Sequence, residues 1–404
     1  MGQAEQMMFG GAVGVRDEVG FLIVHQRYAD HFFPGTSVLH TRLRYALLIP
    51  WLYQSLRTKR PVTKDFGEAF SDIEHELTGR LKYIEGVGGE KDGVIGGEIF
   101  PRTISQPPAY VYWTALTKWG LIGARPDGRP WSRPDMAKLL AASSRRAHHD
   151  DDGKPLETVV WPIAGLIDAP KGWDSWGDWN DRYSKDDQGK LTLDLLPPEQ
   201  IYLANKLRAV RSPTDPSEPS LLSKLVGKPL SGADHCWHNE ILALAGREAA
   251  MLKRAGQAAA LSAIGRAIYA AQVETLKETR DKRPQPNLHR AALNDAIEQW
   301  GKQATRLDMD LFLAEIGHLP PPVEGVLKET TAWVKANGKD PMQLLEVYAR
   351  AEVSRKDNRA RLASNQFGVD RRMEWQGEHH GRAEPLHYRW GNVKRLLRDL
   401  EDVA

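Results

Sequence analysis

The stretch from Ser105 to Gly128 most constrains what this chain can fold into, because it combines a helix, a helix stop and a tight turn. Ser105 can cap the helix, and Pro107 and Pro108 suit only its first turn. Gly120 stands where a helix stop belongs. Apolar side chains recur at helical spacing and predict one buried face, made of Tyr112, Ala115, Leu116 and Trp119.

The residues after Gly120 predict a small wing. Leu121 and Ile122 can start a short strand, and Pro126-Asp127-Gly128 is a strong turn signal. A recognition helix followed by a β-wing has this order of elements. The segment therefore predicts a winged helix-turn-helix embedded in the chain.

The outer face of this helix supplies candidate nucleic-acid contacts. With the apolar face in the core, the helix and the flanks of the wing would present Tyr110, Thr114, Thr117, Lys118, Arg125 and Arg129. Such groups contact phosphates and position a protein on DNA without reading its sequence. The alternative is that Tyr110, Trp113 and Trp119 pack against a neighbouring domain, since winged helices also serve as protein-docking modules.

Length and composition bound the class of protein. A chain of 404 residues is expected to form about two to four domains. Lys and Arg number 55 against 53 Asp and Glu, and the net charge of +2 excludes a strongly basic nucleic-acid coat but permits a local basic patch.

Other features of the composition point to the cytoplasm. The single cysteine, Cys236, cannot form an internal disulfide and fits a reducing cytosol. The first residues carry no secretory signal, and the longest apolar run, Tyr45 to Tyr53, is far shorter than the roughly 20 residues of a membrane span. We therefore expect a cytoplasmic protein without a membrane partner.

Helical patterns dominate the chain, which predicts a mostly α, multi-domain protein with a few short strands. We expect an N-terminal helical unit with a buried helix at 1–60, a winged-helix-like domain at 61–145, a long covering loop or linker at 146–190, an alanine-rich helical domain at 191–283 and a C-terminal helical domain with a basic face at 287–404. Within these segments, Leu191 to Leu195 is a candidate strand. Helices are expected near 65–83, 132–144, 197 onward, 233–280, 288–304, 308–317, 323–337, 341–363 and 391–401.

A buried apolar helix is expected after Thr36 and Ser37, with Pro50 kinking it or ending it. The helix start, together with Arg42 and Arg44, could bind a phosphate through free N–H groups. The favoured alternative is an internal ion pair with a carboxylate such as Asp17, Glu18 or Asp30.

The C-terminal segment is the more basic part of the chain, with twelve Lys and Arg against nine Asp and Glu from Arg350 onward. Its candidate nucleic-acid contacts are Arg355, Lys356, Arg359, Arg361 and Arg389. The last of these lies in the run His387 to Trp390, where aromatic and basic groups alternate in a way that suits base stacking. The alternative is an ordinary solvated charged face.

Patterns that indicate catalysis are scarce, and the sequence predicts no catalytic residue, metal or cofactor. No P-loop and no GxSxG motif is present. A remote alternative is a metal-dependent nuclease in which Asp135, Asp152 and Lys154 converge.

The histidine and tryptophan clusters are also weak signals. His148 to Asp152, and His235 with His238, offer metal-ligand types without a matching partner motif. Tryptophans at 161, 173, 176 and 179 suit either a stacking platform for bases or large side chains that pin a long loop.

Five motifs follow one another along the chain: YADHFFPGTSVLHTRLRYALLIPWLYQSL, PAYVYWTALTKWGLI, IGRAIY, NRARL and LHYRW. In this order they resemble a bacterial family catalogued as a domain of unknown function, family 6361. The resemblance implies one integrated protein and an association with phage-defence genes, and it names no catalytic residue. Arg266 departs from the pattern, because it interrupts a helix of small apolar residues.

These features together predict a non-enzymatic DNA-binding or adaptor subunit of a bacterial phage-defence complex, with DNA and other protein subunits as partners. The competing prediction is a protein-interaction scaffold without nucleic-acid contact.

Overall fold

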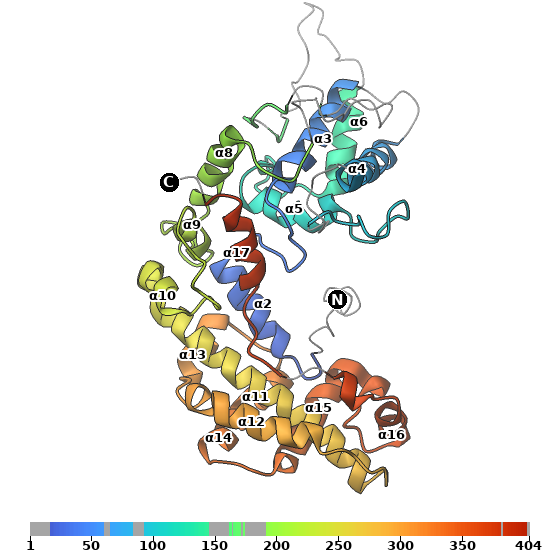
Figure 1. Cartoon of the computed structure of the whole chain (residues 1–404), viewed down its shortest axis with the longest axis vertical. Coiled ribbons are helices and arrows are strands. Elements are labelled where there is room, and N and C mark those ends of the chain that lie inside the picture. The colour runs from blue at the N-terminus through green and yellow to red at the C-terminus, as the bar shows by residue number, and fades with distance from the viewer. Residues whose placement is uncertain are drawn as a thin grey trace, which may run out of the picture. The chain divides into compact units, whose positions relative to one another are not determined.

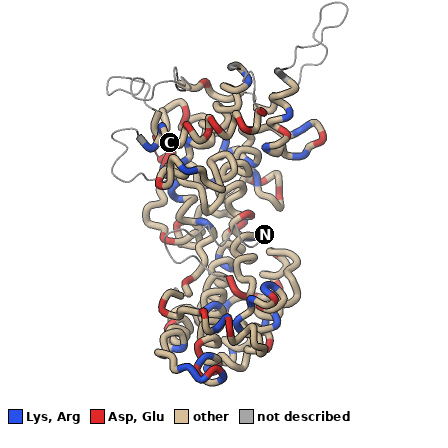
Figure 2. The backbone as a smooth tube through the Cα atoms, turned by 90° about the vertical axis from the view of Figure 1, so that its right-hand side faces the viewer, with Lys and Arg blue, Asp and Glu red and all other residues tan. Residues whose placement is uncertain are grey.

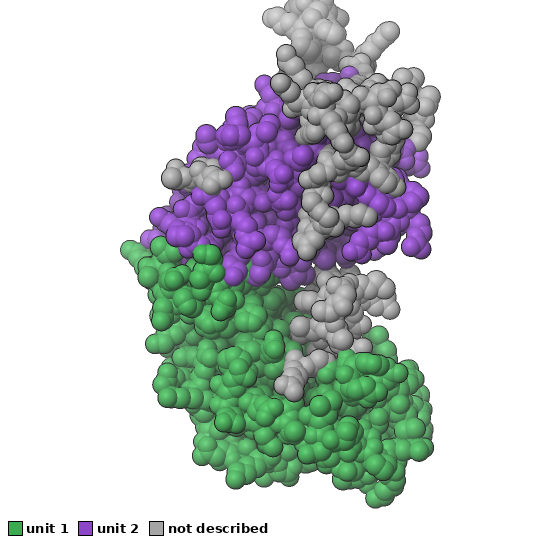
Figure 3. All heavy atoms as spheres, viewed as in Figure 1, with its two compact units in different colours: residues 1–30, 231–390 green, residues 31–230, 391–404 purple. Residues whose placement is uncertain are grey.

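The computed structural model describes residues 17–59, 65–83, 93–144, 161–163, 165–170, 173, 191–380 and 383–401. These residues are mostly helical, as the sequence predicts (Figure 1). The chain folds into two compact units, which are coloured separately in Figure 3. Unit 1 comprises residues 1–30 and 231–390, and unit 2 comprises residues 31–230 and 391–404. The finer five-segment division stays a prediction.

Unit 2 is arranged around α3 (Tyr45–Lys59), whose side chains from Tyr45 to Tyr53 are all buried. Three helices pack against α3: α4 (Phe66–Tyr83), α5 (Pro108–Lys118) and α6 (Arg133–Ser144). The unit also contains α8 (Pro197–Arg208), α9 (Leu221–Leu225) and α17 (Trp390–Arg398), of which Trp390 is assigned to unit 1.

Unit 1 is built on α11 (Ala249–Thr279), a long helix whose small side chains let neighbours approach closely. A Cβ at Gly265 would lie 2.2 Å from Cζ of Phe21, and one at Gly256 would lie 2.6 Å from Cγ of Trp237. The other helices are α2 (Phe21–Phe32, the last two residues assigned to unit 2), α10 (Asn239–Ala245), α12 (Leu288–Ala304), α13 (Met309–Ile316), α14 (Pro321–Lys335), α15 (Leu345–Lys356) and α16 (Gln366–Met373). Short 3-10 turns occur at Gly246–Glu248, Pro341–Leu344, Asp357–Arg359 and Gly377–His379.

Several expected helix boundaries need correction. The helix expected after Ser37 begins only at Tyr45, and it continues through Pro50 to Lys59. The helix expected at 233–280 is interrupted at Gly246, whose φ of +61° ends α10. The helix expected at 341–363 ends at Lys356, because Asp357 adopts a left-handed φ of +48°.

The expected short strands are absent from the part of the chain that the structure describes. The only β-type pairing there is an isolated bridge between Arg211 and Pro219. Residues Leu191 to Leu195 are not a strand, and the Thr192 carbonyl accepts a hydrogen bond from Arg44 instead of from a neighbouring strand. Among the described residues, none of the helices combines the length and apolar character needed to cross a bilayer.

Candidate nucleic-acid interface

The first turn of α5 is capped from a distant helix rather than by Ser105, which corrects the sequence prediction. Pro107 and Pro108 carry no backbone N–H, and the residue preceding α5, Pro107, provides no side-chain cap. The Ala109 N–H donates a 2.5 Å hydrogen bond to the Glu74 carboxylate of α4. Burial raises the pKa of Glu74 to about 7, although the Ala109 hydrogen bond and the charge of Arg133 oppose that rise.

The end of α5 follows the predicted stop but not the predicted strand. Gly120 adopts a φ of +69°, which favours glycine over residues with a Cβ. The N–H groups of Leu121 and Ile122 both donate to the Leu116 carbonyl, at 2.9 Å each. Because these donors close the helix end, Leu121 and Ile122 do not form the expected wing strand.

The buried face of α5 is the predicted one. Tyr112, Ala115, Leu116 and Trp119 are all buried. The His40 ring stacks on Tyr112 with centroids 4.2 Å apart, and the Trp119 indole N–H donates to the Pro34 carbonyl. These contacts fix which face of α5 is turned outward.

The opposite face of α5 presents the residues proposed from the sequence. Tyr110 is 45% exposed, Thr114 and Lys118 are exposed, and Thr117 is half-buried. A row of hydroxyls with one ammonium group therefore lies on the surface of unit 2.

A tight turn at 125–129 stands where the wing was expected. The Arg125 N–H donates to the Arg129 carbonyl at 2.9 Å, and Gly128 takes a φ of +79°. Arg125 is held by Asp135 at 3.1 Å and lies 3.5 Å from Asp127. The Arg129 side chain is 80% exposed, so it is the more accessible guanidinium of the turn.

Two residues that the sequence analysis did not select complete this surface. The Arg133 guanidinium lies 5.0 Å from the Tyr110 ring centroid, and Arg125 lies 5.5 Å from that of Trp131. Arg133 is the first residue of α6, after a capping box in which Ser132 and Asp135 exchange hydrogen bonds. The helix dipole disfavours a cation in the first turn of a helix. An arginine at this position was therefore a sequence signal that could have pointed to Arg133 as a functional residue.

Four of the five candidate cations near the C-terminus form ion pairs within unit 1. Arg355 pairs with Asp17 at 2.9 Å, and Arg361 pairs with Glu18 at 2.9 Å. Two further pairs are Lys356 with Glu18 and Arg389 with Asp30. Arg359 is exposed. These pairs join the α2 segment to the C-terminal part of unit 1, which gives the charges a structural role and leaves nucleic-acid contact at these positions a prediction.

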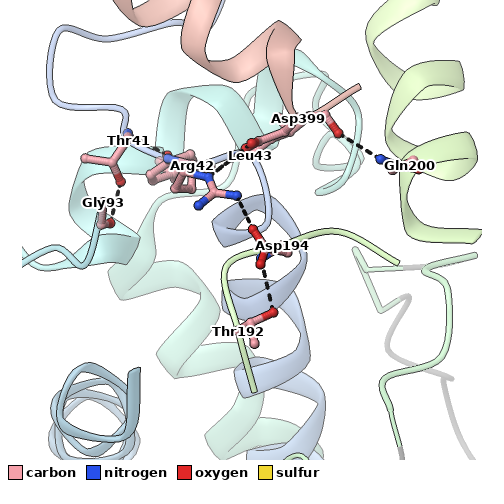
Figure 4. Close-up of polar contacts among 9 residues, drawn as sticks. Thr41, Arg42, Leu43, Gly93, Thr192, Asp194, Gln200 and Asp399 are labelled. Atoms are coloured by element: carbon pink, nitrogen blue, oxygen red, sulfur yellow. Dashed lines mark hydrogen bonds and ion pairs between the residues drawn. The ribbon is translucent and has the colours of Figure 1, made fainter. Parts of the chain in front are cut away.

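Arg42 forms an ion-pair network within unit 2 (Figure 4). Its guanidinium donates to Asp399 at 3.0 Å and to Asp194 at 2.7 Å. The Asp399 carboxylate also accepts the Leu43 N–H at 2.7 Å, so it connects the residue that follows α17 to the segment before α3.

Arg44 forms a second, buried pair with Glu199 at 2.7 Å, both side chains being at most 3% exposed. The favoured internal-ion-pair interpretation of Arg42 and Arg44 is therefore correct, but the expected partners, Asp17, Glu18 and Asp30, are wrong. The true partners could not be predicted from the sequence, because they lie far away along the chain: Glu199 is 155 residues from Arg44.

The remaining candidates add no metal centre within the described ranges. His235 and His238 have ring centroids 5.8 Å apart, and no group of three potential metal ligands occurs in the described part of the chain. Trp173 is buried against Trp51, as expected for a side chain that pins a loop. Outside the described residues lie the run from His148 to Asp152, Lys154, Trp176 and Trp179.

Comparison with known families supports the resemblance seen in the sequence. Residues 8–130 match the model described as a family of unknown function, DUF6361. The matched segment includes α2 to α5 and the turn at 125–129, and over this segment the chain is similar to that family. The motifs IGRAIY, NRARL and LHYRW lie beyond the matched residues. No curated protein and no solved structure matches the chain.

Proposed function

We propose that the protein is a non-enzymatic DNA-binding or adaptor subunit in which unit 2 contacts the DNA backbone. The contact surface is the outer face of α5 with the turn at 125–129. The observation that carries the proposal is the exposure of Tyr110, Thr114 and Lys118 on one helix face, beside the largely exposed Arg129 side chain. Hydroxyls and cations of this kind bind phosphate oxygens.

The local charge supports this assignment. The segment from Ser105 to Ser144 contains five Lys and Arg against two Asp, a net of +3 in a chain whose total is +2. Elsewhere cations and carboxylates are interspersed along the chain, as Figure 2 illustrates. A weak, salt-sensitive contact therefore fits better than a high-affinity basic coat.

Charge reversal tests the proposal. We expect Lys118→Glu combined with Arg129→Glu to lower affinity for a labelled duplex about tenfold or more at low salt, and to flatten the dependence of affinity on salt. Lys228→Glu, at another exposed lysine of unit 2, is the matched control and should leave binding unchanged. Unchanged duplex affinity in the double variant would refute the proposed interface.

A protein-interaction scaffold without nucleic-acid contact is the second candidate. The ion pairs of Arg355, Lys356, Arg361 and Arg389 favour it, because they pair four of the five C-terminal candidate cations with carboxylates of unit 1. Three further parts of the proposal rest on the sequence alone. They are a cytoplasmic location, a winged-helix origin for the α5 region and membership of a phage-defence complex. The nuclease alternative depends on residues outside the described ranges and gains no support from the structure.

A further inference from the structure

Two guanidinium groups lie close to two aromatic rings in the part of unit 2 that contains α5. Arg133 lies 5.0 Å from the centre of the Tyr110 ring, and Arg125 lies 5.5 Å from that of Trp131. Trp113, one turn after Tyr110, connects the two pairs, because its indole N–H donates a 2.7 Å hydrogen bond to the Trp131 carbonyl. Tyr110, Trp113 and Trp131, with Arg125 and Arg133, are called the aromatic platform below.

The two arginines differ in how firmly they are held. Arg125 is fixed by the Asp135 carboxylate at 3.1 Å. Arg133 is half-buried, forms no ion pair with a carboxylate among the described residues and lies over the Tyr110 ring. Because no carboxylate of the described residues pairs with it, the Arg133 guanidinium keeps hydrogen-bond donors that can contact a phosphate.

The exposure of Tyr110 also needs an explanation. Tyr110 is 45% exposed although it lies on a helix whose other face is buried. An exposed aromatic ring beside arginines is the arrangement on which unpaired bases stack while the cations meet the backbone. In a duplex the base faces are already covered by neighbouring base pairs, so a protruding tyrosine gains no stacking there.

We propose that the aromatic platform binds single-stranded DNA, with a base stacked on Tyr110 and the adjoining phosphates contacted by Arg133, Lys118 and Arg129. The anionic backbone of DNA complements the charge of this surface, since the segment from Ser105 to Ser144 has a net charge of +3. This inference rests on the proposed DNA-binding function and specifies the form of DNA that the surface prefers.

The test compares a labelled oligothymidylate with a labelled duplex of the same length, using the full chain. Tyr110→Ala should weaken oligothymidylate binding by about 5- to 150-fold, the range that base stacking supports, and should weaken duplex binding much less, because there it removes only one hydroxyl contact. Tyr110→Phe keeps the ring and should retain most of the wild-type affinity for oligothymidylate. Tyr202→Ala is the control elsewhere in unit 2, because Tyr202 is half-buried and the Lys206 ammonium lies 5.5 Å from the centre of its ring.

The outcomes separate this inference from the function on which it rests. If Tyr110→Ala binds oligothymidylate as well as wild type, or if it weakens both DNA forms equally, single-strand stacking is wrong. The proposed function still holds after either of these results if the Lys118→Glu/Arg129→Glu variant loses duplex affinity. Absence of binding of either DNA by the wild-type protein at low salt overturns both. Tyr110 is exposed, so its replacement should not disturb the fold. Thermal unfolding that matches the wild type verifies that each variant is folded.

Discussion

Replacing Glu74 with Gln should change how the stability of unit 2 depends on pH. The Glu74 side chain is 3% exposed, and its carboxylate accepts the first free N–H of α5. Burial raises its pKa from 4.5 to about 7, so the folded protein holds a proton that the unfolded chain releases. Glutamine keeps an oxygen that can accept the Ala109 N–H but cannot ionise.

The sign and size of the effect follow from proton linkage. A carboxyl group whose pKa is higher in the folded state contributes most to stability below pH 4.5, and that contribution falls as the pH rises to about 7. The full change corresponds to roughly 3 kcal/mol, and most of it, about 2–3 kcal/mol, falls between pH 5 and pH 8. The wild-type protein should therefore lose that much stability relative to Glu74→Gln across this interval.

Urea unfolding followed by tryptophan fluorescence at pH 5 and pH 8 measures this difference. Taking the difference between wild type and variant at each pH removes the contribution of other groups, such as His25, whose pKa burial lowers to about 3. Glu68→Gln, at an exposed position of the same helix, is the control and should show no such pH dependence. The reasoning is refuted if the stability difference for Glu74→Gln is the same at both pH values.

The remaining predictions concern the packing of each unit. In Gly120→Ala the new Cβ meets no atom within 4 Å, so the variant should lose only about 1 kcal/mol of stability through its positive φ. Gly265→Ala places a Cβ 2.2 Å from the Phe21 ring and should lose more stability. Thermal unfolding of both variants measures the difference, and equal losses of stability would contradict the packing argument. Arg44→Met leaves the Glu199 carboxylate buried without its cationic partner and should cost about 3–5 kcal/mol, while adding Glu199→Gln, which removes the charge and keeps an acceptor for the Leu196 N–H, should restore most of that loss. A double variant no more stable than Arg44→Met would show that the pair is not the cause.

Short-range signals in the sequence were sufficient to predict much of the helical structure. Ser132 and Asp135 form a capping box at the start of the helix expected at 132–144, Gly120 ends α5, and the helix expected at 288–304 matches α12. Each of these features depends on residues within a few positions of one another, where hydrogen-bond geometry and backbone preference act directly. The buried and exposed faces of α5 were predictable for the same reason, because helical spacing fixes which side chains share a face.

The sequence by itself determined these local elements, whereas only the tertiary structure decided the partners of the polar groups. Glu74, 35 residues from Ala109, caps α5 in place of Ser105. Arg42 finds Asp399 at a separation of 357 residues, and the expected strand at Leu121 and Ile122 is replaced by bonds to Leu116. A strand forms only beside a neighbouring strand, and an ion pair or a cation–π contact forms only where two side chains lie close together. Chain spacing encodes neither, because such contacts arise only when distant segments pack together.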